Sequence, residues 1–326
     1  MYRFFIMLVL SLLLAGCGAE QATPAATTNA PAAITVTDDY GNKVILPHKP
    51  QKIMTTHIYL DNMLLGLVEP ERMLSVSKNM DKTSKTFAGA GVTQIANKIT
   101  MPGMEAVFSL KPDLFIVHDL VGEDKVQAYR EMGVPVYVVK IPMDIKAVQS
   151  EILKLSQVVG EKQRGETLVK KMDKQLARIE ANIPKDLQFS KSAVLVAANH
   201  SFYGGKGCMY DDVCQYAKVR NGIADLGIDN GQTVSKEVMI QINPDYFFLT
   251  KSWNDDKASD DKVLREFLAD KSLADLQAVK QGHIALIDEK YIFAGHQNCV
   301  WSVQKLAHAV YGDKVALEPE EFLKGF

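Results

Sequence analysis

The chain has 326 residues, of which 47% are hydrophobic and 23% are charged, and its formal net charge is −2 at pH 7. This composition is that of a globular protein and excludes a disordered chain. Because the slight acidity comes without a cluster of lysine or arginine, nucleic acid is also excluded as the main partner.

The first seventeen residues have the pattern of a bacterial lipoprotein signal. Arg3 gives one positive charge, residues 4–14 are apolar apart from Ser11, and Ala15-Gly16-Cys17 follows. The apolar run is shorter than the roughly 17 residues that a membrane-spanning helix needs, and small residues typical of a cleavage site end it. An ordinary secretory signal or a short membrane helix is the alternative. We expect residues 1–16 to be removed and Cys17 to be acylated, which would hold the exported protein at a membrane surface.

A flexible tether is predicted at residues 17–33. This stretch is small, polar and proline-containing, with no aromatic or large aliphatic residue. Such a segment cannot bury enough apolar area to offset the entropy lost on ordering. The body of the chain, residues 34–326, is long enough for two domains of ordinary size.

The first half of the body alternates short apolar runs with helical patterns. Residues 34–38 and 43–46 flank an Asp-Tyr-Gly-Asn turn, which predicts a hairpin. Four further runs suit strands buried on both faces, at 53–56, 73–76, 113–117 and 136–139. Helices are predicted between and after them, at 59–67, 103–110, 122–132 and 145–159.

A long helix divides this half from a second one with the same alternation. It is predicted at 161–183, with Pro184 ending it, and it is largely polar apart from one apolar stripe. In the second half, strands are predicted at 193–197, 246–249 and 284–287, and helices near 208–217, 235–242, 261–269 and 301–310. We therefore expect two doubly wound α/β lobes, at 34–160 and 185–326, joined by a single connecting helix at 161–184.

Three cysteines lie in the second half, and none belongs to a CxxC pair. A structural zinc site is therefore not expected. An exported protein can hold a disulfide, so Cys208–Cys299 or Cys214–Cys299 is conceivable, and three buried unpaired thiols are an equal alternative.

An internal repeat places the same pattern once in each half. Glu105 opens a stretch that continues to Lys-Pro-Asp113 and an apolar strand, and Glu237 opens one that continues to Asn-Pro-Asp245 and another such strand. Each copy is read as a short helix that ends before a proline and leads into a buried strand.

These features resemble one family, the substrate-binding proteins of ABC importers for iron–siderophore, haem and cobalamin. The resemblance covers 34–326, beginning with the hairpin and strand entry ITVTDDYGNKVILPHKPQKI at 34–53 and including both Glu-Pro-Asp stretches. It implies two α/β lobes on one long helix, no intrinsic cofactor, and a monomer that delivers a small metal chelate to a permease dimer with its ATPase.

The resemblance also implies that Glu105 and Glu237 dock onto permease arginines. Both glutamates also suit the first turn of a helix electrostatically. The stretch at 217–220, Ala-Lys-Val-Arg, departs from the family by lacking its glycine.

Histidines and aromatic residues gather where the predicted strands end, the usual ligand-binding edge of an open α/β sheet. Imidazole can bind a transition metal, tyrosine or methionine can bind haem iron, and aromatic rings can stack on a flat ligand. We expect the ligand to contact His57, Tyr59, His118, His200, Tyr203, Trp253 and His296, the four histidines reaching a metal through the bound chelate. Met80, Met101 and Met104 are further soft ligands or ordinary core residues. A strongly anionic siderophore would need arginines, and few lie near these loops.

No catalytic pattern stands out in the sequence. It has no GxSxG or HExxH, and Gly204-Gly205-Lys206-Gly207 lacks the spacing of a phosphate-binding loop. We expect a binding protein and no enzyme. Two alternatives are a metal-handling chelatase with the same architecture and a surface sensor that does not feed a transporter.

Overall fold

The computed structural model describes residues 33–252, 256–292 and 294–326, which form one compact unit. The predicted signal, the lipid-attachment residue Cys17 and the predicted ligand contact Trp253 lie outside the described residues. Within the described part, no helix is long and apolar enough to cross a bilayer.

The first lobe is built on a parallel sheet with helices on both faces. Its strands are β3 (Ile53–Thr55), β6 (Leu114–His118) and β7 (Val136–Val139), in the order β3-β6-β7. Successive side chains of β6 enter different cores, Leu114 and Ile116 one and Phe115 and Val117 the other. Both faces are covered, which explains why the sequence of this strand is apolar throughout.

The helices of this lobe follow the predicted order. They are α1 (Ile58–Leu65), α2 (Met104–Leu110), α3 (Glu123–Glu131) and α4 (Ile145–Val158). The hairpin β1 (Ile34–Thr37) and β2 (Lys43–Leu46) is antiparallel, as predicted. The expected strand at 73–76 is reduced to β4 (Ser75–Val76), which pairs in parallel with the unpredicted β5 (Asn97–Lys98).

The second lobe repeats this architecture around its own parallel sheet, in the order β10-β8-β11-β12. The strands are β8 (Ser192–Val196), β10 (Arg220–Asn221), β11 (Tyr246–Thr250) and β12 (Ile284–Ile287), and β9 (Phe202–Tyr203) pairs antiparallel with β8. Its helices are α6 (Met209–Tyr216), α7 (Lys236–Ile242), α8 (Lys257–Leu268), α9 (Gln277–Lys280) and α10 (Cys299–Tyr311). Two α/β lobes with helices on both faces confirm the predicted fold class.

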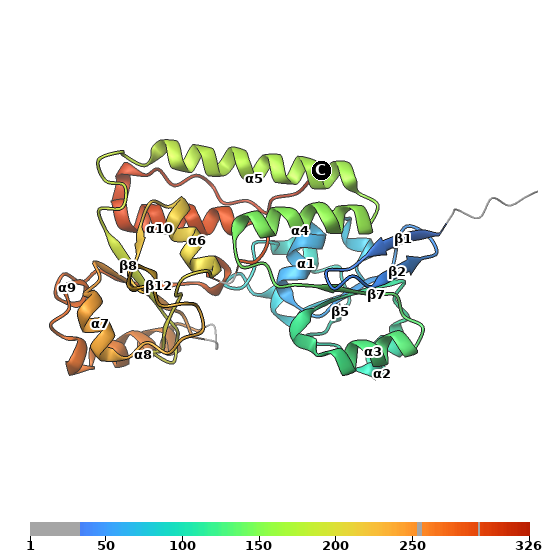
Figure 1. The fold of residues 1–326 in the computed structure, drawn as a ribbon, viewed down its shortest axis with the longest axis horizontal. Coiled ribbons are helices and arrows are strands. Elements are labelled where there is room, and N and C mark those ends of the chain that lie inside the picture. Colours follow the sequence, from blue (N-terminus) through green and yellow to red (C-terminus); the bar gives the residue numbers. More distant parts are fainter. Residues whose placement is uncertain (1–32, 253–255, 293) are drawn as a thin grey trace, which may run out of the picture. The chain divides into compact units, whose positions relative to one another are not determined.

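One long helix runs alongside both lobes. This is α5 (Lys162–Asn182), which contacts α4 of the first lobe and α10 of the second, as Figure 1 shows. Its 21 residues span roughly 31 Å. Leu168, Met172 and Ile179 are buried on its inner stripe. The residue boundaries that we assign to the lobes as domains remain predictions.

A second connection between the lobes was not anticipated from the sequence. After α10, the chain returns beside α5 to the first lobe, where the C-terminus lies (Figure 1). The Gly325 N–H donates to the Gly66 carbonyl at 2.8 Å, at the end of α1. A Cβ atom at Gly325 would lie 2.2 Å from the Arg164 carbonyl oxygen of α5, so only glycine allows this approach.

The cysteines form no disulfide among the described residues. Cys208, Cys214 and Cys299 are buried free thiols, and burial raises the pKa of all three. Of the two alternatives left open by the sequence, unpaired thiols are therefore confirmed.

The segment that departs from the family pattern keeps a left-handed backbone without glycine. Lys218, which follows the C-cap residue of α6, has φ 56°. Its carbonyl accepts a hydrogen bond from the Tyr311 hydroxyl, and its Nζ pairs with Glu180 Oε1 at 2.8 Å. These contacts offset the roughly 1 kcal/mol that a left-handed residue other than glycine costs.

Candidate ligand-binding site

A cavity of about 370 Å³ lies where strands of the two sheets end. Its volume is within the range of about 300–1,000 Å³ typical of small-molecule sites. The wall from the first lobe follows β3, β6 and β7, and the wall from the second lobe follows β8 and β12. The lining residues include His57, Tyr59, Asn79, His118, Leu120, Ile141, Met143, Tyr203, Met209, Tyr210, Glu289 and Ile292.

His57 is fixed by its position before α1. It is the N-cap residue of that helix, with extended backbone, and its Nδ1 accepts the Tyr59 N–H at 3.4 Å. Its ring meets the His118 ring edge-on, with centroids 5.4 Å apart. Burial, reinforced by the neighbouring His118, lowers the pKa of His57 to about 4. The imidazole is therefore uncharged at neutral pH.

His118 is the last residue of β6, and its side chain is left without a partner. The residue is 5% exposed, and within the described part of the chain neither ring nitrogen has a hydrogen-bond partner. Its backbone N–H donates to Thr56 Oγ1 at 3.2 Å, which fixes the end of the strand. Burial lowers the pKa of His118, so the ring offers one donor and one acceptor nitrogen. A buried polar group without a partner is costly, and a bound ligand can supply the missing partner.

Tyr59 completes a group of three rings on the first-lobe wall. Its ring centroid lies 5.1 Å from that of His57 and 6.5 Å from that of His118. The phenol hydroxyl is buried and unpartnered, and burial strongly raises the pKa of Tyr59. Across the cavity, β9 brings Tyr203 to the wall, where 37% of that residue is exposed. Four of the predicted contacts therefore share one cavity.

His200 lies in a different hollow. It has a left-handed backbone (φ 65°), its Nε2 contacts the Val263 carbonyl oxygen at 3.1 Å, and its ring packs near Phe267. The neighbouring hollow of about 410 Å³ that it lines shares only Tyr203 with the main cavity.

His296 is buried behind Tyr59, outside the main cavity. It is 3% exposed, its Nδ1 accepts the Asn298 N–H at 3.3 Å, and burial lowers its pKa to about 3. It lines a chamber of about 40 Å³ together with Tyr59 and Lys85. The four histidines thus do not form one cluster. Among the described residues no group of three or more His, Cys, Asp or Glu side chains is placed to hold a metal ion by itself.

The methionines that reach the cavity are different from those that the sequence suggested. Met80 is a core residue, and Met101 and Met104 are exposed near α2, away from the cavity lining. Met143 and Met209 line the cavity instead. Met143 follows the end of β7, so its position after a strand was a usable signal. Met209 belongs to α6, and only the tertiary fold brings it there.

The glycine-rich stretch after β9 serves close packing. A Cβ atom at Gly205 would lie 2.6 Å from the Asp229 carbonyl oxygen, and one at Gly204 would lie 2.6 Å from the Tyr210 ring. These glycines let the loop approach a neighbouring segment and a cavity-lining tyrosine. They explain the glycine-rich sequence without a phosphate site.

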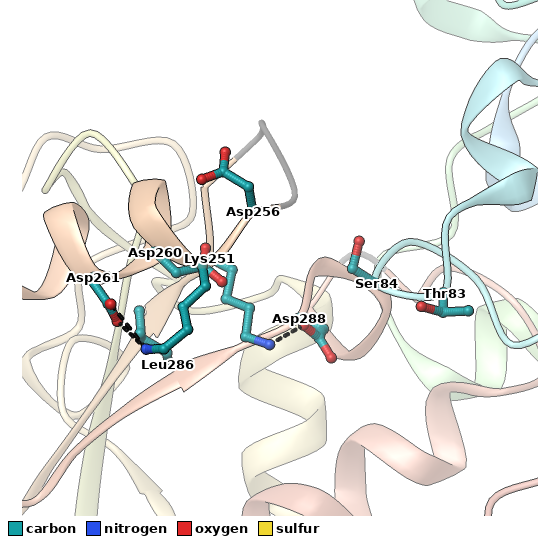
Figure 2. A pocket seen from close by; sticks show the side chains of 9 residues that line it. Thr83, Ser84, Lys251, Asp256, Asp260, Asp261, Leu286 and Asp288 are labelled. Atoms are coloured by element: carbon teal, nitrogen blue, oxygen red, sulfur yellow. Dashed lines mark hydrogen bonds and ion pairs between the residues drawn. The ribbon is translucent and has the colours of Figure 1, made fainter.

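A separate charged hollow of about 450 Å³ contains side chains that are already paired. Figure 2 shows Lys251 directed at Asp288, and its Nζ lies 2.7 Å from Asp288 Oδ1. Lys257, which also lines the hollow, has its Nζ 2.8 Å from Asp261 Oδ1. Asp260 accepts the Ser252 N–H at 2.8 Å. Both lysines of this hollow are therefore already paired with aspartates, whereas the main cavity contains buried polar groups without a hydrogen-bond partner among the described residues.

The two predicted docking glutamates occupy equivalent helices. Glu105 is in the first turn of α2 and Glu237 is in the first turn of α7, and both are exposed. Both helices have seven residues and end in a left-handed residue, Lys111 (φ 50°) and Asn243 (φ 44°) respectively.

The aspartate of each repeat fastens its helix to the sheet. Asp113 accepts the backbone N–H groups of Gln51 and Lys52, each at 2.8 Å. Asp245 accepts the backbone N–H of Ser192 at 2.8 Å and the Lys191 ammonium at 3.0 Å. In each lobe the carboxylate therefore holds the chain where a neighbouring strand begins, which explains the Pro-Asp pattern structurally.

Comparison with known proteins gives a family match over most of the body. The family model for periplasmic binding proteins matches residues 77–291. The ABC transporter substrate-binding lipoprotein YvrC of Bacillus subtilis is 22% identical over 94% of this chain and 96% of its own length. The petrobactin-binding protein YclQ of the same organism is 22% identical over 87% of this chain and 89% of its own length.

Solved structures share the fold at low identity. A periplasmic binding protein of Veillonella parvula superposes with a TM-score of 0.72 at 20% identity, covering 87% of this chain and 99% of its own. The periplasmic haem-binding protein RhuT of Roseiflexus sp. RS-1 gives a TM-score of 0.65 at 20% identity, covering 82% and 99%.

Proposed function

Because the chain belongs to the periplasmic binding protein family, we propose that it captures an iron complex, haem or cobalamin between its lobes and delivers it to an ABC permease. The family and the relatives are substrate-binding proteins of transporters, so the chain is a binding protein and no enzyme, which sets the chelatase alternative aside. The observation that carries the choice of ligand is His118, whose two buried ring nitrogens have no hydrogen-bond partner among the described residues.

The chemistry of the first-lobe wall supports a metal chelate as the ligand. His57 and His118 are uncharged because burial lowers both pKa values, so each has a lone pair that a transition metal can accept. The unpartnered Tyr59 hydroxyl adds a third group that can bind the metal or an oxygen of the chelate. One relative is named for binding petrobactin and one structural neighbour for binding haem, which agrees with this ligand class.

Export and anchoring follow from the N-terminal segment in this proposal. Acylated Cys17 would hold the protein at the membrane, and residues 18–33 would let the body reach the permease. Tethering raises the effective concentration of the loaded protein near its partner. The name of the relative YvrC, a substrate-binding lipoprotein, supports this assignment.

Delivery would use the two equivalent glutamates. Glu105 and Glu237 are exposed on matching helices, one in each lobe, so a permease dimer with two similar arginine sites would accept one from each. We expect only modest movement of the lobes on binding. The continuous helix α5 resists bending, and the C-terminal segment ties the lobes a second time.

The absorption spectrum of the protein purified from its native host tests the ligand class. Haem, cobalamin and many ferric chelates absorb distinctively, and we expect one of these spectra together with its loss in His118→Ala. Calorimetry with haemin, cyanocobalamin and ferric chelates covers a ligand lost in purification. If none of them binds and the native protein is colourless, the ligand proposal is wrong.

Transport and sensing are separated by uptake measurements on Glu105→Ala and Glu237→Ala. We expect both variants to bind ligand normally while uptake falls. Glu266→Ala, at an exposed glutamate of α8, is the matched control and should leave uptake unchanged. Normal uptake in the double variant would contradict the docking role and leave the sensor as the better interpretation.

A further inference from the structure

The charges around the main cavity point to one class of chelate. We infer that the cargo presents no net negative charge to the cavity wall, which selects an uncharged metal chelate over an anionic one. This inference rests on the proposed function and deepens it, because it concerns the same cavity.

The lining contains no cationic side chain that could receive an anion. None of the described residues that line the cavity is lysine or arginine. The undescribed residues at 253–255 and 293 are Trp-Asn-Asp and Phe, so they add no cation. The only formal charge on the described wall is the carboxylate of Glu289.

The buried ammonium group of Lys85, in the chamber behind Tyr59, is already neutralised by that carboxylate. Lys85 Nζ lies 2.5 Å from Glu289 Oε1, and the two side chains are only 5% and 13% exposed. Both residues line the small chamber behind Tyr59, whereas Glu289 alone reaches the main cavity. The pair joins the segment before η3 (Gly89–Val92) to the loop after β12, so it also links the two lobes.

Two other lysines next to the cavity wall in sequence are directed at aromatic rings. Lys140, beside Ile141, places its Nζ 4.9 Å from the centroid of the Tyr40 ring. Lys290, beside Glu289, places its Nζ 4.6 Å from the centroid of the Phe87 ring. Such cation–π contacts hold the ammonium groups outside the cavity lining.

The consequence for a bound chelate follows from solvation. Removing an ionic group from water without a compensating partner costs several kcal/mol per charge, whereas an uncharged chelate avoids that cost. About 1.4 kcal/mol corresponds to a tenfold change in affinity, so discrimination of roughly a hundredfold is expected between chelates of similar size. Haem also presents no negative charge to the cavity wall when its carboxylates remain in solvent at the mouth of the cavity.

Fluorescence titration of the full chain with four chelates of defined charge tests the inference. The uncharged probes are a ferric trihydroxamate complex and cyanocobalamin, and the anionic probes are a ferric tricatecholate complex and ferric citrate. We expect an uncharged probe to bind roughly a hundredfold more tightly than either anionic one. Tighter binding of an anionic probe overturns the inference but leaves the proposed function intact. Failure of all four and of haemin overturns the proposed function itself.

Removing one negative charge from the wall should narrow the preference for uncharged chelates. Glu289→Gln removes the carboxylate that neutralises Lys85, and we expect at least a tenfold gain in affinity for the tricatecholate complex. Asp288→Asn is the matched control, because it removes the same charge from the neighbouring Lys251–Asp288 pair in the hollow of Figure 2. Asp288→Asn should change neither the affinity for the uncharged probes nor the affinity for the tricatecholate complex.

A second variant covers the case in which Glu289→Gln destabilises the fold. Leu120 lines the cavity and is 75% exposed, so Leu120→Arg adds a cation without disturbing the core. It should also gain affinity for the tricatecholate complex, with an unchanged melting temperature. If both folded variants still reject the anionic complex as strongly as the parent does, charge is not what selects the cargo and the inference is wrong.

Discussion

The two lobes are alike at their outer helices and unlike at the cavity between them. Outside, α2 and α7 have the same length, the same left-handed end and an aspartate that fastens each to its sheet. Inside, both lobes contribute phenol rings and a methionine, but among the described lining residues the two imidazoles come from the first lobe and the paired carboxylate comes from the second.

This contrast shows which parts of a repeated architecture must stay similar. Both lobes have a short helix that leads into a buried strand. Each therefore keeps the left-handed residue that ends the helix and the aspartate that accepts backbone N–H groups near the neighbouring strand. The side chains at strand ends do not hold the fold together, so they are free to differ between lobes. In the proposed function, the outer similarity suits a partner with two similar docking sites, and the inner difference suits a single cargo without symmetry.

The largest expected effect comes from replacing the aspartate of each outer repeat, which tests whether the two repeats contribute equally to stability. Asp113→Ala leaves two backbone N–H groups without their charged acceptor, and Asp245→Ala leaves one such N–H and the Lys191 ammonium. Hydrogen bonds of this kind contribute about 1.5–3 kcal/mol each. We expect each variant to lose about 3 kcal/mol in the free energy of unfolding, measured by urea denaturation. Asp113→Asn and Asp245→Asn keep one acceptor oxygen and should lose about half as much. A large loss in one lobe alone would show that the repeats are similar in shape but not in energy.

The difference between the cavity walls is tested by comparing two histidines at strand ends. His118→Ala removes the unpartnered imidazole of the first lobe, whereas His200→Ala changes a residue of the separate hollow. We expect ligand affinity to fall roughly tenfold to a hundredfold in the first variant, about 1.4–2.8 kcal/mol, and to stay within twofold in the second. Equal losses would mean that the hollow at His200 is part of the binding site.

The smallest expected effect concerns a buried acid beneath the first-lobe wall. Among the described residues, the buried carboxylates are Asp38, Asp61 and Glu151, all before α5. Burial raises the pKa of Asp61 to about 7, although Thr55 Oγ1 donates to it at 2.5 Å and the Ser77 N–H at 2.7 Å.

The pH dependence follows from the sign of that shift. The folded protein binds the Asp61 proton more tightly than the unfolded chain, whose pKa is near 4. This contribution to stability is complete below about pH 4 and is lost as pH rises to about 7. Asp61→Asn should therefore be more stable than the parent at pH 8, by on the order of 1 kcal/mol, and equal to it near pH 4. Thermal melts at both values check this, and a constant difference would assign the effect to packing.

Much of the fold was predictable because local sequence carries it. Runs such as 114–118 are apolar at every position because helices cover both faces of the sheet, so they read as buried strands. The apolar stripe of α5 and the proline at 184 predicted the connecting helix. The repeat that runs from Glu to Pro-Asp predicted α2 and α7. The two-residue strands β5, β9 and β10 were missed because their pairing depends on neighbours far along the chain.

The candidate site was only partly predictable. The sequence located strand ends, and strand ends of a parallel sheet do meet at one edge, so four of the predicted residues, His57, Tyr59, His118 and Tyr203, line the same cavity. Their contact with a ligand stays a prediction. Position after a strand does not say which way a side chain turns. The side chain of His200 lines a separate hollow, and that of His296 lies in the interior. The cavity residues Met209 and Glu289 were not predicted from the sequence.

The sequence by itself determined the two α/β lobes, the long helix between them and the paired outer repeats, because hydrophobic periodicity and helix ends are set by neighbours a few residues apart. Only the tertiary structure decided which histidines share a cavity, that Lys85 is neutralised by Glu289, and that the C-terminal segment returns to α1. Those contacts join residues far apart in the chain. Their distances depend on how whole elements pack, and no local pattern records them.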